Sequence, residues 1–358
     1  MPTTTSPSSH AKNPYDLRAA NLAKDQDAIL HVCQASSLSS TSAKYRWNYE
    51  RNPIHGAWCE VAVDTATERV VGTTALFSRR LLVDGEQFRA AVAGDFAVEP
   101  SHRILYPAIA LQRAAVKACN EGGFDVLYAF PNHASRPIQI RAGYKAVGPL
   151  RVGVRLLNIG TFLQKHNHDG WWVSATSVLD WVLNHASKES RIAPLKDYCF
   201  CRLDAFDSRF DSFWARALVQ FSTVLERSSS YANWRFMECP TKKYSLFAAV
   251  ERRTGDIGGY VVSWSESGKT RISDIMAFDD VYDGLLAALI DAERQRGSYC
   301  VTIVYLGSSS LIHRLQRFGF IFRRTTSQLL VYVNSTIPAL QRLFDASAWY
   351  LLDGDSDS

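Results

Sequence analysis

The stretch VEPSHRILYPAIALQRA, residues 98–114, is the most informative part of this chain. An apolar run ends at Val98 and a helix is predicted to begin near Pro107, because proline suits the first helical turn, where its missing N–H costs nothing. The first backbone N–H groups of such a helix point outward, with the positive end of the helix dipole behind them. This geometry binds phosphate, and Arg103 adds a charge that can bind it with two hydrogen bonds.

A hairpin pattern precedes this stretch and recurs in the second half of the chain. In each half, two strand-like runs flank a polar turn that contains glycine, which is typical of β-hairpins. Trp47 lies 25 residues before Gly72 of the first hairpin, and Trp234 lies 25 residues before Gly259 of the second. The paired runs are residues 60–63 with 73–77 and residues 245–250 with 260–264.

A helix, a strand and a corner of glycine with an aromatic residue follow in both halves. In the first half, Leu111, Ala115 and Ala118 share one face of the predicted helix, which Gly122 ends. The second half repeats this order at low residue identity, so two mixed α/β units are the simplest account. The repeated segments are residues 107–120, 124–130 and 141–144 in the first half and residues 285–290, 299–305 and 317–320 in the second.

These repeats define the predicted organisation of the chain. We expect an α/β fold of the α+β mixed-sheet kind in two similar domains, because each half supplies strands and helices in the same order. Residues 1–15 are polar and rich in Ser, Thr and Pro, which indicates a disordered leader without the apolar core of a secretory signal. The expected segments are 16–165 for the first domain, 166–200 for a linker and helix, 201–345 for the second domain and 346–358 for an acidic tail.

Composition excludes several classes of protein. The 358 residues are 47% hydrophobic and 21% charged, which is ordinary for a globular protein and unlike a disordered or collagen-like chain. A net charge of +5 is too small to indicate nucleic-acid binding by itself, and no apolar run approaches the roughly 18 residues of a membrane span. Seven scattered cysteines without a C-x-x-C pair favour free thiols in a reducing cytoplasm over a disulfide framework. The segment 166–169, HNHD, is more typical of a solvated loop than of a metal site, so no metal is expected.

The order of elements resembles the GNAT acyltransferase superfamily over about residues 16–158. Val98 to Arg103 is similar to that family's V-x-P-x-x-R entry to its acyl-CoA pyrophosphate loop, and residues 128–135 are similar to the following strand and its Asn turn. The resemblance implies a tandem GNAT fold with a degenerate second copy, which also occurs in peptidoglycan aminoacyltransferases. It assigns acetyl-CoA or another acyl-CoA to Val98, Arg103, Ile104, Leu105, Tyr106, Ala108, Asn132 and Ser135.

Two departures from the family pattern leave alternatives open. Tyr106 stands where the loop's first glycine is expected, and Pro107 removes a donor. If the phenol crowds the pyrophosphate, CoA affinity suffers; if it projects away, the amides remain usable. The family's acid, a tyrosine, is replaced by Gln139. In the second half the helix start is acidic, with Asp279 and Asp280, so that unit is expected to lack a CoA site and to shape the acceptor cleft.

The resemblance also suggests catalytic candidates, each with a structural alternative. Direct attack of an amine on a thioester needs a base, donors for the oxyanion and often an acid. Asp95 in an apolar strand is the leading base, or else a hydrogen-bonded carboxylate at a turn. Glu99 and His133 are further candidates for the base that are also typical of solvated loops, and Tyr128 is a candidate acid that is also typical of a packed core.

Three functions remain in competition. The first is an acyl-CoA-dependent N-acyltransferase, of the acetyltransferase kind, acting on a small-molecule amine such as an amino sugar or amino acid. The second is an aminoacyltransferase that uses charged tRNA, which needs a basic groove across both halves. The third is a catalytically silent GNAT-fold binding protein, in which Tyr106 and Gln139 replace the family's glycine and tyrosine because the site has been lost. The sequence does not decide the oligomeric state.

Overall fold

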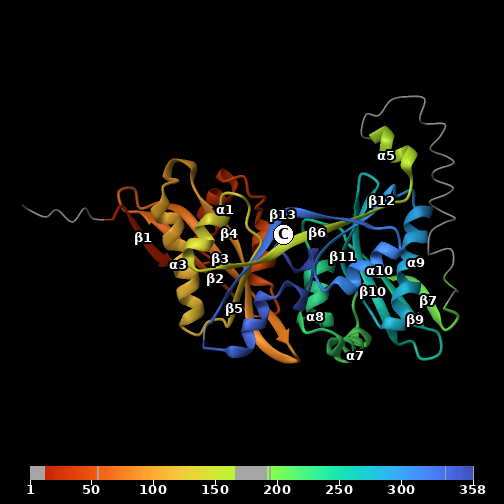
Figure 1. Ribbon diagram of the computed structural model, residues 1–358. Helices are drawn as coiled ribbons and strands as arrows, with labels where there is room; N and C mark the ends of the chain where they lie inside the picture. The colour runs from red at the N-terminus through yellow and green to blue at the C-terminus, as the bar shows by residue number, and fades with distance from the viewer. Residues whose placement is uncertain (1–12, 55, 166–191, 193–194, 335, 358) are drawn as a thin grey trace, which may run out of the picture.

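The computed structural model describes residues 13–54, 56–165, 192, 195–334 and 336–357 (Figure 1). Most of the expected leader and most of the expected linker and helix, including the 166–169 segment, therefore lie outside the described residues. The fold is mixed α/β, as predicted, with one large sheet that extends through both halves of the molecule.

The first half contains each element expected from the sequence. Glycine ends the predicted helices and turns, and Gly143 at the corner has a φ of 114°, which favours glycine. The strands are β1 (Tyr15–Ala19), β2 (Ala57–Asp64), β3 (Val70–Val83), β4 (Glu86–Val98), β5 (Val126–Ala129) and β6 (Lys145–Leu156). The helices are α1 (Gln26–Ala35), α2 (Ser42–Tyr45), α3 (Leu105–Asn120), α4 (Arg136–Ala142) and α5 (Ile159–Lys165).

The second half repeats this order. The predicted hairpin corresponds to β9 and β10, and the predicted helix with its acidic start corresponds to α9. The strands are β7 (Tyr198–Leu203), β8 (Thr223–Leu225), β9 (Ser245–Glu251), β10 (Ile257–Glu266), β11 (Lys269–Ala277), β12 (Cys300–Gly307), β13 (Ile321–Val333) and β14 (Trp349–Leu352). The helices are α7 (Ser208–Ala217), α8 (Ser229–Ala232), α9 (Asp279–Gln295) and α10 (Ser309–Arg317).

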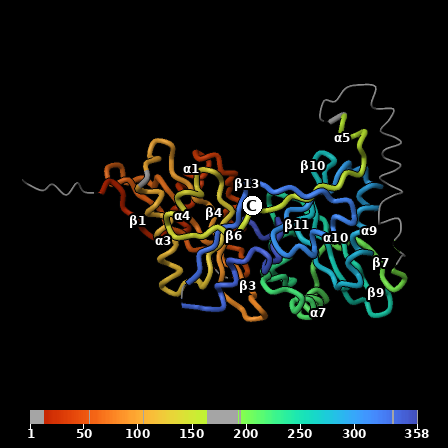
Figure 2. Tube along the Cα trace, viewed as in Figure 1, coloured from red at the N-terminus to blue at the C-terminus, as the bar shows by residue number. Residues whose placement is uncertain are grey.

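Two long strands join the halves into one sheet. The strand order is β1-β2-β3-β4-β5-β13-β6-β12-β11-β10-β9-β7, so β13 from the end of the chain lies between β5 and β6. The start of β6 pairs with the end of β13 beside β5, and the end of β6, Arg151–Leu156, pairs with β12. Figures 1 and 2 show both strands crossing the centre of the molecule. Each half is therefore completed by a strand that begins in the other.

A tryptophan pair lies at the junction. Trp47 and Trp234, the residues that precede the two hairpins, stack with ring centroids 4.8 Å apart. Each indole Nε1 donates a hydrogen bond to the other's carbonyl oxygen, at 2.7 Å from Trp47 and 3.0 Å from Trp234. Arg79 lies over the Trp234 ring and Arg235 over the Trp47 ring. The contact is reciprocal because the two halves present the same local structure to each other.

The C-terminal segment, residues 346–357, is held between the halves. The buried guanidinium of Arg227 bridges Asp274, at 2.8 Å from Nε, and Asp355, at 2.7 Å. Arg235 Nε donates to the Gly354 carbonyl, and the Tyr128 hydroxyl of the first half donates to the Asp355 carbonyl at 3.0 Å. This segment, which the composition suggests is an acidic tail, forms β14 and a 3₁₀ turn at the centre of the molecule (Figure 1).

Two further findings concern the class of protein. The seven cysteines all lie within the described residues, and none of them forms a disulfide. None of the helices within the described residues has the length and apolar character needed to cross a membrane.

Replacing Trp47 with alanine is predicted to lower the free energy of unfolding by roughly 3–5 kcal/mol, because a buried ring and its stacking partner are lost. Urea denaturation followed by circular dichroism measures this. The Trp234→Ala variant provides a second measurement, and the double variant should lose less than the sum of the two single losses, because the two rings contact each other. Additive losses would contradict a direct coupling between the two rings.

Candidate active site

A cavity opens where β4 and β5 separate. The two strands pair in parallel only over Ala90–Val92 and Val126–Tyr128. Beyond these residues lies a cavity of about 360 Å³. Its walls come from β4, from the turn after β5, from α4, from the segment between α1 and α2, and from the C-terminal segment. The lining residues are Ser37–Ser39, Lys44, Ala93–Phe96, Ala129–Asn132, Ser135, Gln139 and Asp357.

A β-bulge places Asp95 at this cavity. The register between β3 and β4 shifts between Thr73 and Ala75, so β4 carries one extra residue there. Asp95 has a φ of 44°, a left-handed conformation that aspartate tolerates better than most residues. Its Oδ2 accepts a hydrogen bond from the Tyr49 hydroxyl at 2.9 Å. Because the bulge redirects the strand, the carboxylate lies on the cavity wall.

The environment of Asp95 raises the affinity of its carboxyl for a proton above that of an exposed aspartate. Burial raises the pKa of Asp95, and the negative charge of Asp357 raises it further. The positive charge of Lys44 and the hydrogen bond from Tyr49 act in the opposite direction. Perturbed carboxyl groups of this kind are found in active sites, where a base must hold a proton during the reaction.

Asp357 approaches the bulge because residue 94 is glycine. A Cβ added at Gly94 would lie 3.1 Å from Asp357 Oδ2 and 2.7 Å from the ring of Phe77. A larger side chain there would therefore displace the C-terminal segment or the aromatic ring. Asp357 and Lys44 could not be predicted as site residues from the sequence, because neither is near β4 in the chain and Asp357 lies in a run that resembles a solvated tail.

The turn after β5 and helix α4 form the opposite wall. Asn132 Oδ1 accepts hydrogen bonds from the backbone N–H groups of Ala134 and Ser135 and from the Ser135 hydroxyl. Asn132 therefore shapes the turn and also lines the cavity. Gln139 is 3% exposed, and its side-chain oxygen has no hydrogen-bond partner within the described part of the chain.

The expected pyrophosphate loop follows β4 directly. Arg103 is exposed, and its Nε donates to the Val98 carbonyl at 3.1 Å, which fixes the guanidinium beside the strand end. Tyr106 lies within α3 and does not have a positive φ, so no glycine is required for the backbone there. Its ring is 43% exposed and stacks on Tyr15 of β1, with centroids 6.4 Å apart. Ile104 is also exposed, and Ala108 lies half-buried in the first turns of α3, whose backbone includes Leu105.

Three of the catalytic candidates lie outside the cavity. Glu99 is buried beside Arg69 and His31, with Oε1 3.5 Å and 3.4 Å from their nitrogens. The hydroxyl of the buried Tyr128 holds the C-terminal segment, and burial raises the pKa of Tyr128. His133 is exposed on the turn and does not line the cavity. The structure therefore brings together Asp95, Asn132 and Ser135 and separates them from these three residues.

The equivalent place in the second half is filled by the chain itself. There β11 and β12 pair over Lys269–Ile272 and Cys300–Ile303 and then separate, as β4 and β5 do. Beyond that point Tyr305–Gly307 of β12 pairs with Tyr350–Leu352 of β14. The C-terminal segment thus occupies in the second half the position that is open in the first.

A family model described as an acetyltransferase (GNAT) domain matches residues 16–147. No curated protein matches the chain by sequence.

Solved structures similar to the chain share its fold at low sequence identity. A probable N-acyltransferase from Enterococcus faecalis V583 has a TM-score of 0.66 and 10% identity, over 90% of this chain and 73% of that protein. A GCN5-related N-acetyltransferase from Kribbella flavida has a TM-score of 0.59 and 16% identity, over 91% and 73%. The N-myristoyltransferase of Saccharomyces cerevisiae with bound myristoyl-CoA has a TM-score of 0.55 and 10% identity, over 90% and 83%. Residues 16–147 are therefore similar to a GNAT acetyltransferase domain, and the chain as a whole shares the fold of these N-acyltransferases.

Proposed function

We propose that this protein is an acyl-CoA-dependent N-acyltransferase with one active site, in the first half, that acts on a small-molecule amine. The observation that carries the proposal is the cavity between the separated strands β4 and β5, with Asp95 and Asp357 on its wall. The GNAT fold supports acyl transfer from CoA in general. The acceptor class, the acetyl group and the residue roles below are our inference.

Binding of the acyl-CoA would begin at the loop after β4. The N-terminus of α3 would offer the backbone N–H groups of Leu105 and Tyr106 to the pyrophosphate, since the Ile104 N–H already donates to the His102 carbonyl, and Arg103 adds its charge. The stacking of Tyr106 on Tyr15 supports the alternative in which the phenol does not crowd the amides. The pantetheine arm would then enter along Val98 and the open edge of β4, facing the turn of Asn132 and Ser135.

The chemistry would take place at the bulge. The acceptor enters as an ammonium ion, and the carboxylate of Asp95 takes a proton from its nitrogen. The free amine attacks the thioester carbonyl carbon, and a backbone N–H at the bulge would donate to the developing oxyanion. The C–S bond then breaks, giving an amide and a CoA thiolate, and the thiolate becomes the thiol by taking the second proton that the nitrogen releases. The buried amide of Gln139 lies in the same cavity and can donate to that thiolate.

The charge of the cavity indicates the kind of acceptor. Two carboxylates, Asp95 and Asp357, and one cation, Lys44, line it. This balance attracts a cationic amine and disfavours an anionic acceptor. A small amine such as an amino sugar or amino acid matches the size of the cavity, whereas no observation in the structure favours charged tRNA.

Replacing Arg103 with alanine is predicted to weaken acetyl-CoA binding about tenfold, because a charge-assisted hydrogen bond to the pyrophosphate is lost. Isothermal titration calorimetry with acetyl-CoA measures the dissociation constant. The matched control is Arg253→Ala, which removes an equal charge from an exposed residue of the second half. Equal affinities for wild type and the Arg103 variant would contradict the loop assignment, and no binding by wild type would favour a silent fold.

Replacing Asp95 with asparagine is predicted to lower kcat by about 10²–10⁴-fold, because the base is lost. A thiol-release assay with acetyl-CoA and a panel of amino sugars and amino acids measures the rate. The control is Asp84→Asn, an exposed aspartate that also has a positive φ but lies at the far end of the β3–β4 hairpin. An unchanged kcat in the Asp95 variant would show that another group is the base.

The pH dependence of the reaction tests the contact between the two carboxylates. Because Asp95 must be ionised to accept a proton, kcat/KM should fall as the pH drops through its raised pKa. In Asp357→Asn the neighbouring negative charge is gone, so the pKa of Asp95 should fall and the acidic limb should move to lower pH. The measurement is a pH–rate profile of both proteins, and a limb that does not move would contradict an interaction between the two groups.

A further inference from the structure

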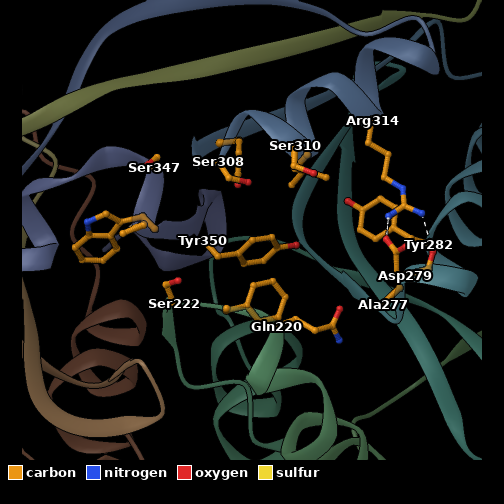
Figure 3. Close-up of a pocket in the computed structure, with 15 residues that line it drawn as sticks. Gln220, Ser222, Ala277, Asp279, Tyr282, Ser308, Ser310, Arg314, Ser347 and Tyr350 are labelled. Atoms are coloured by element: carbon orange, nitrogen blue, oxygen red, sulfur yellow. Dashed lines mark hydrogen bonds and ion pairs between the residues drawn. The ribbon is translucent and has the colours of Figure 1, made fainter.

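The second half carries a cavity of its own, outside the site described above. It has a volume of about 290 Å³ and lies beyond the end of β11, between the start of α9, the start of α10 and the C-terminal segment (Figure 3). This volume is near the lower end of the range of about 300–1,000 Å³ for small-molecule sites. Because β14 fills the gap between β11 and β12, the cavity is a separate compartment and not a second acyl-CoA channel.

Hydroxyl groups dominate the wall of this cavity. Ser308 and Ser310 lie at the start of α10, Ser222 lies across from them, and Tyr282 comes from α9. Tyr282 is only 6% exposed, and its hydroxyl has no hydrogen-bond partner within the described residues. Figure 3 shows this hydroxyl turned towards the cavity. A buried phenol without a partner is unusual, because buried polar groups are nearly always satisfied, so it indicates a missing hydrogen-bonding group.

The ionisation of Tyr282 is also consistent with a hydrogen-bonding role. Burial raises the pKa of Tyr282, so the side chain remains a neutral phenol at physiological pH. A neutral phenol can both donate and accept a hydrogen bond, as a ligand hydroxyl can.

The charges at the cavity disfavour an anion. Arg314 lines it, but its guanidinium is engaged by Asp279 and by Asp283, whose Oδ1 lies 2.5 Å from Nε. The same guanidinium lies 4.7 Å from the centre of the Tyr282 ring. Asp279 and Asp280 lie in the first turn of α9, where their negative charges offset the positive end of the helix dipole. A phosphate or carboxylate would therefore have to compete with Asp279 and Asp283 for the guanidinium of Arg314.

Aromatic rings form part of the wall. Phe221 and Tyr350 both line the cavity, and their ring centroids are 4.3 Å apart. The Tyr350 hydroxyl donates to the Ile275 carbonyl, which holds this ring in place. Sites that combine fixed aromatic rings with hydroxyl and amide groups suit ligands that have both C–H faces and hydroxyl groups.

We propose that this cavity is a binding site for an uncharged, polyhydroxylated molecule of monosaccharide size, with the Tyr282 hydroxyl as a direct hydrogen-bonding partner. The site is distinct from the acyl-CoA cleft, and the proposal goes beyond the transfer reaction without depending on it. The hydroxyl-lined wall binds the hydroxyl groups of the ligand, the aromatic rings contact its C–H face, and the carboxylates at the start of α9 exclude its phosphorylated form.

Ligand-observed saturation-transfer NMR on the full chain tests the proposal. The probes are glucose, galactose, mannose and N-acetylglucosamine, with glucose 6-phosphate as the anionic comparison. We expect saturable binding of at least one neutral sugar and weaker binding of the phosphate. The proposal is overturned if none of the four neutral sugars binds saturably, or if glucose 6-phosphate binds more tightly than glucose.

Two pairs of variants locate the binding. Tyr282→Phe removes only the hydroxyl and should weaken sugar binding about fivefold, the effect of one neutral hydrogen bond. Its control is Tyr144→Phe, because Tyr144 is also a buried tyrosine whose hydroxyl has no partner within the described residues, but it lies in the first half. Ser310→Trp should fill the cavity and abolish binding, while Ser309→Trp, at an exposed neighbour that does not line the cavity, should not. Equal binding by Tyr282→Phe and wild type, or by the two tryptophan variants, would place the sugar elsewhere.

Discussion

The organisation of this protein depends on a buried arginine between two carboxylates. Arg227 contacts Asp274 of β11 and Asp355 of the C-terminal segment, and all three side chains are almost fully buried. A buried charge is costly unless it is paired, so the guanidinium and the two aspartates are stable only together. The C-terminal segment is thereby held at the centre of the molecule, where β14 fills the gap in the second half and Asp357 reaches the cavity of the first.

One segment therefore makes two similar halves different. Both halves have a pair of parallel strands that separate towards their ends, between β4 and β5 and between β11 and β12. The first gap is open, and the loop that follows β4 carries an exposed arginine. The second gap is occupied by β14, and the helix that follows β11 begins with acidic residues. The exchange of β6 and β13 and the stacking of Trp47 on Trp234 hold the halves in the arrangement that this requires.

The candidate site was predictable from the sequence only in part. Arg103, Asn132 and Asp95 could be found because each lies in a local pattern: the start of a helix, a turn after a strand, and a charge within an apolar run. The bulge could not be predicted, because it is a mismatch in register between two strands that only their pairing reveals. Glu99 and Tyr128 have the right chemistry near the right place, but their side chains face an ion pair and the C-terminal segment instead.

The sequence by itself determined the order of elements, the repeat and the start of a helix directly after the loop at residues 98–104, because these depend on local periodicity and turn residues. Only the tertiary structure decided that β13 lies between β5 and β6, that residues 349–352 form a strand beside β12, and that Asp357 lies beside Asp95. These features join residues that are far apart in the sequence, from 43 positions between Gly307 and Tyr350 to 262 between Asp95 and Asp357, and the strand pairing and burial that bring them together leave no periodic signal in the chain.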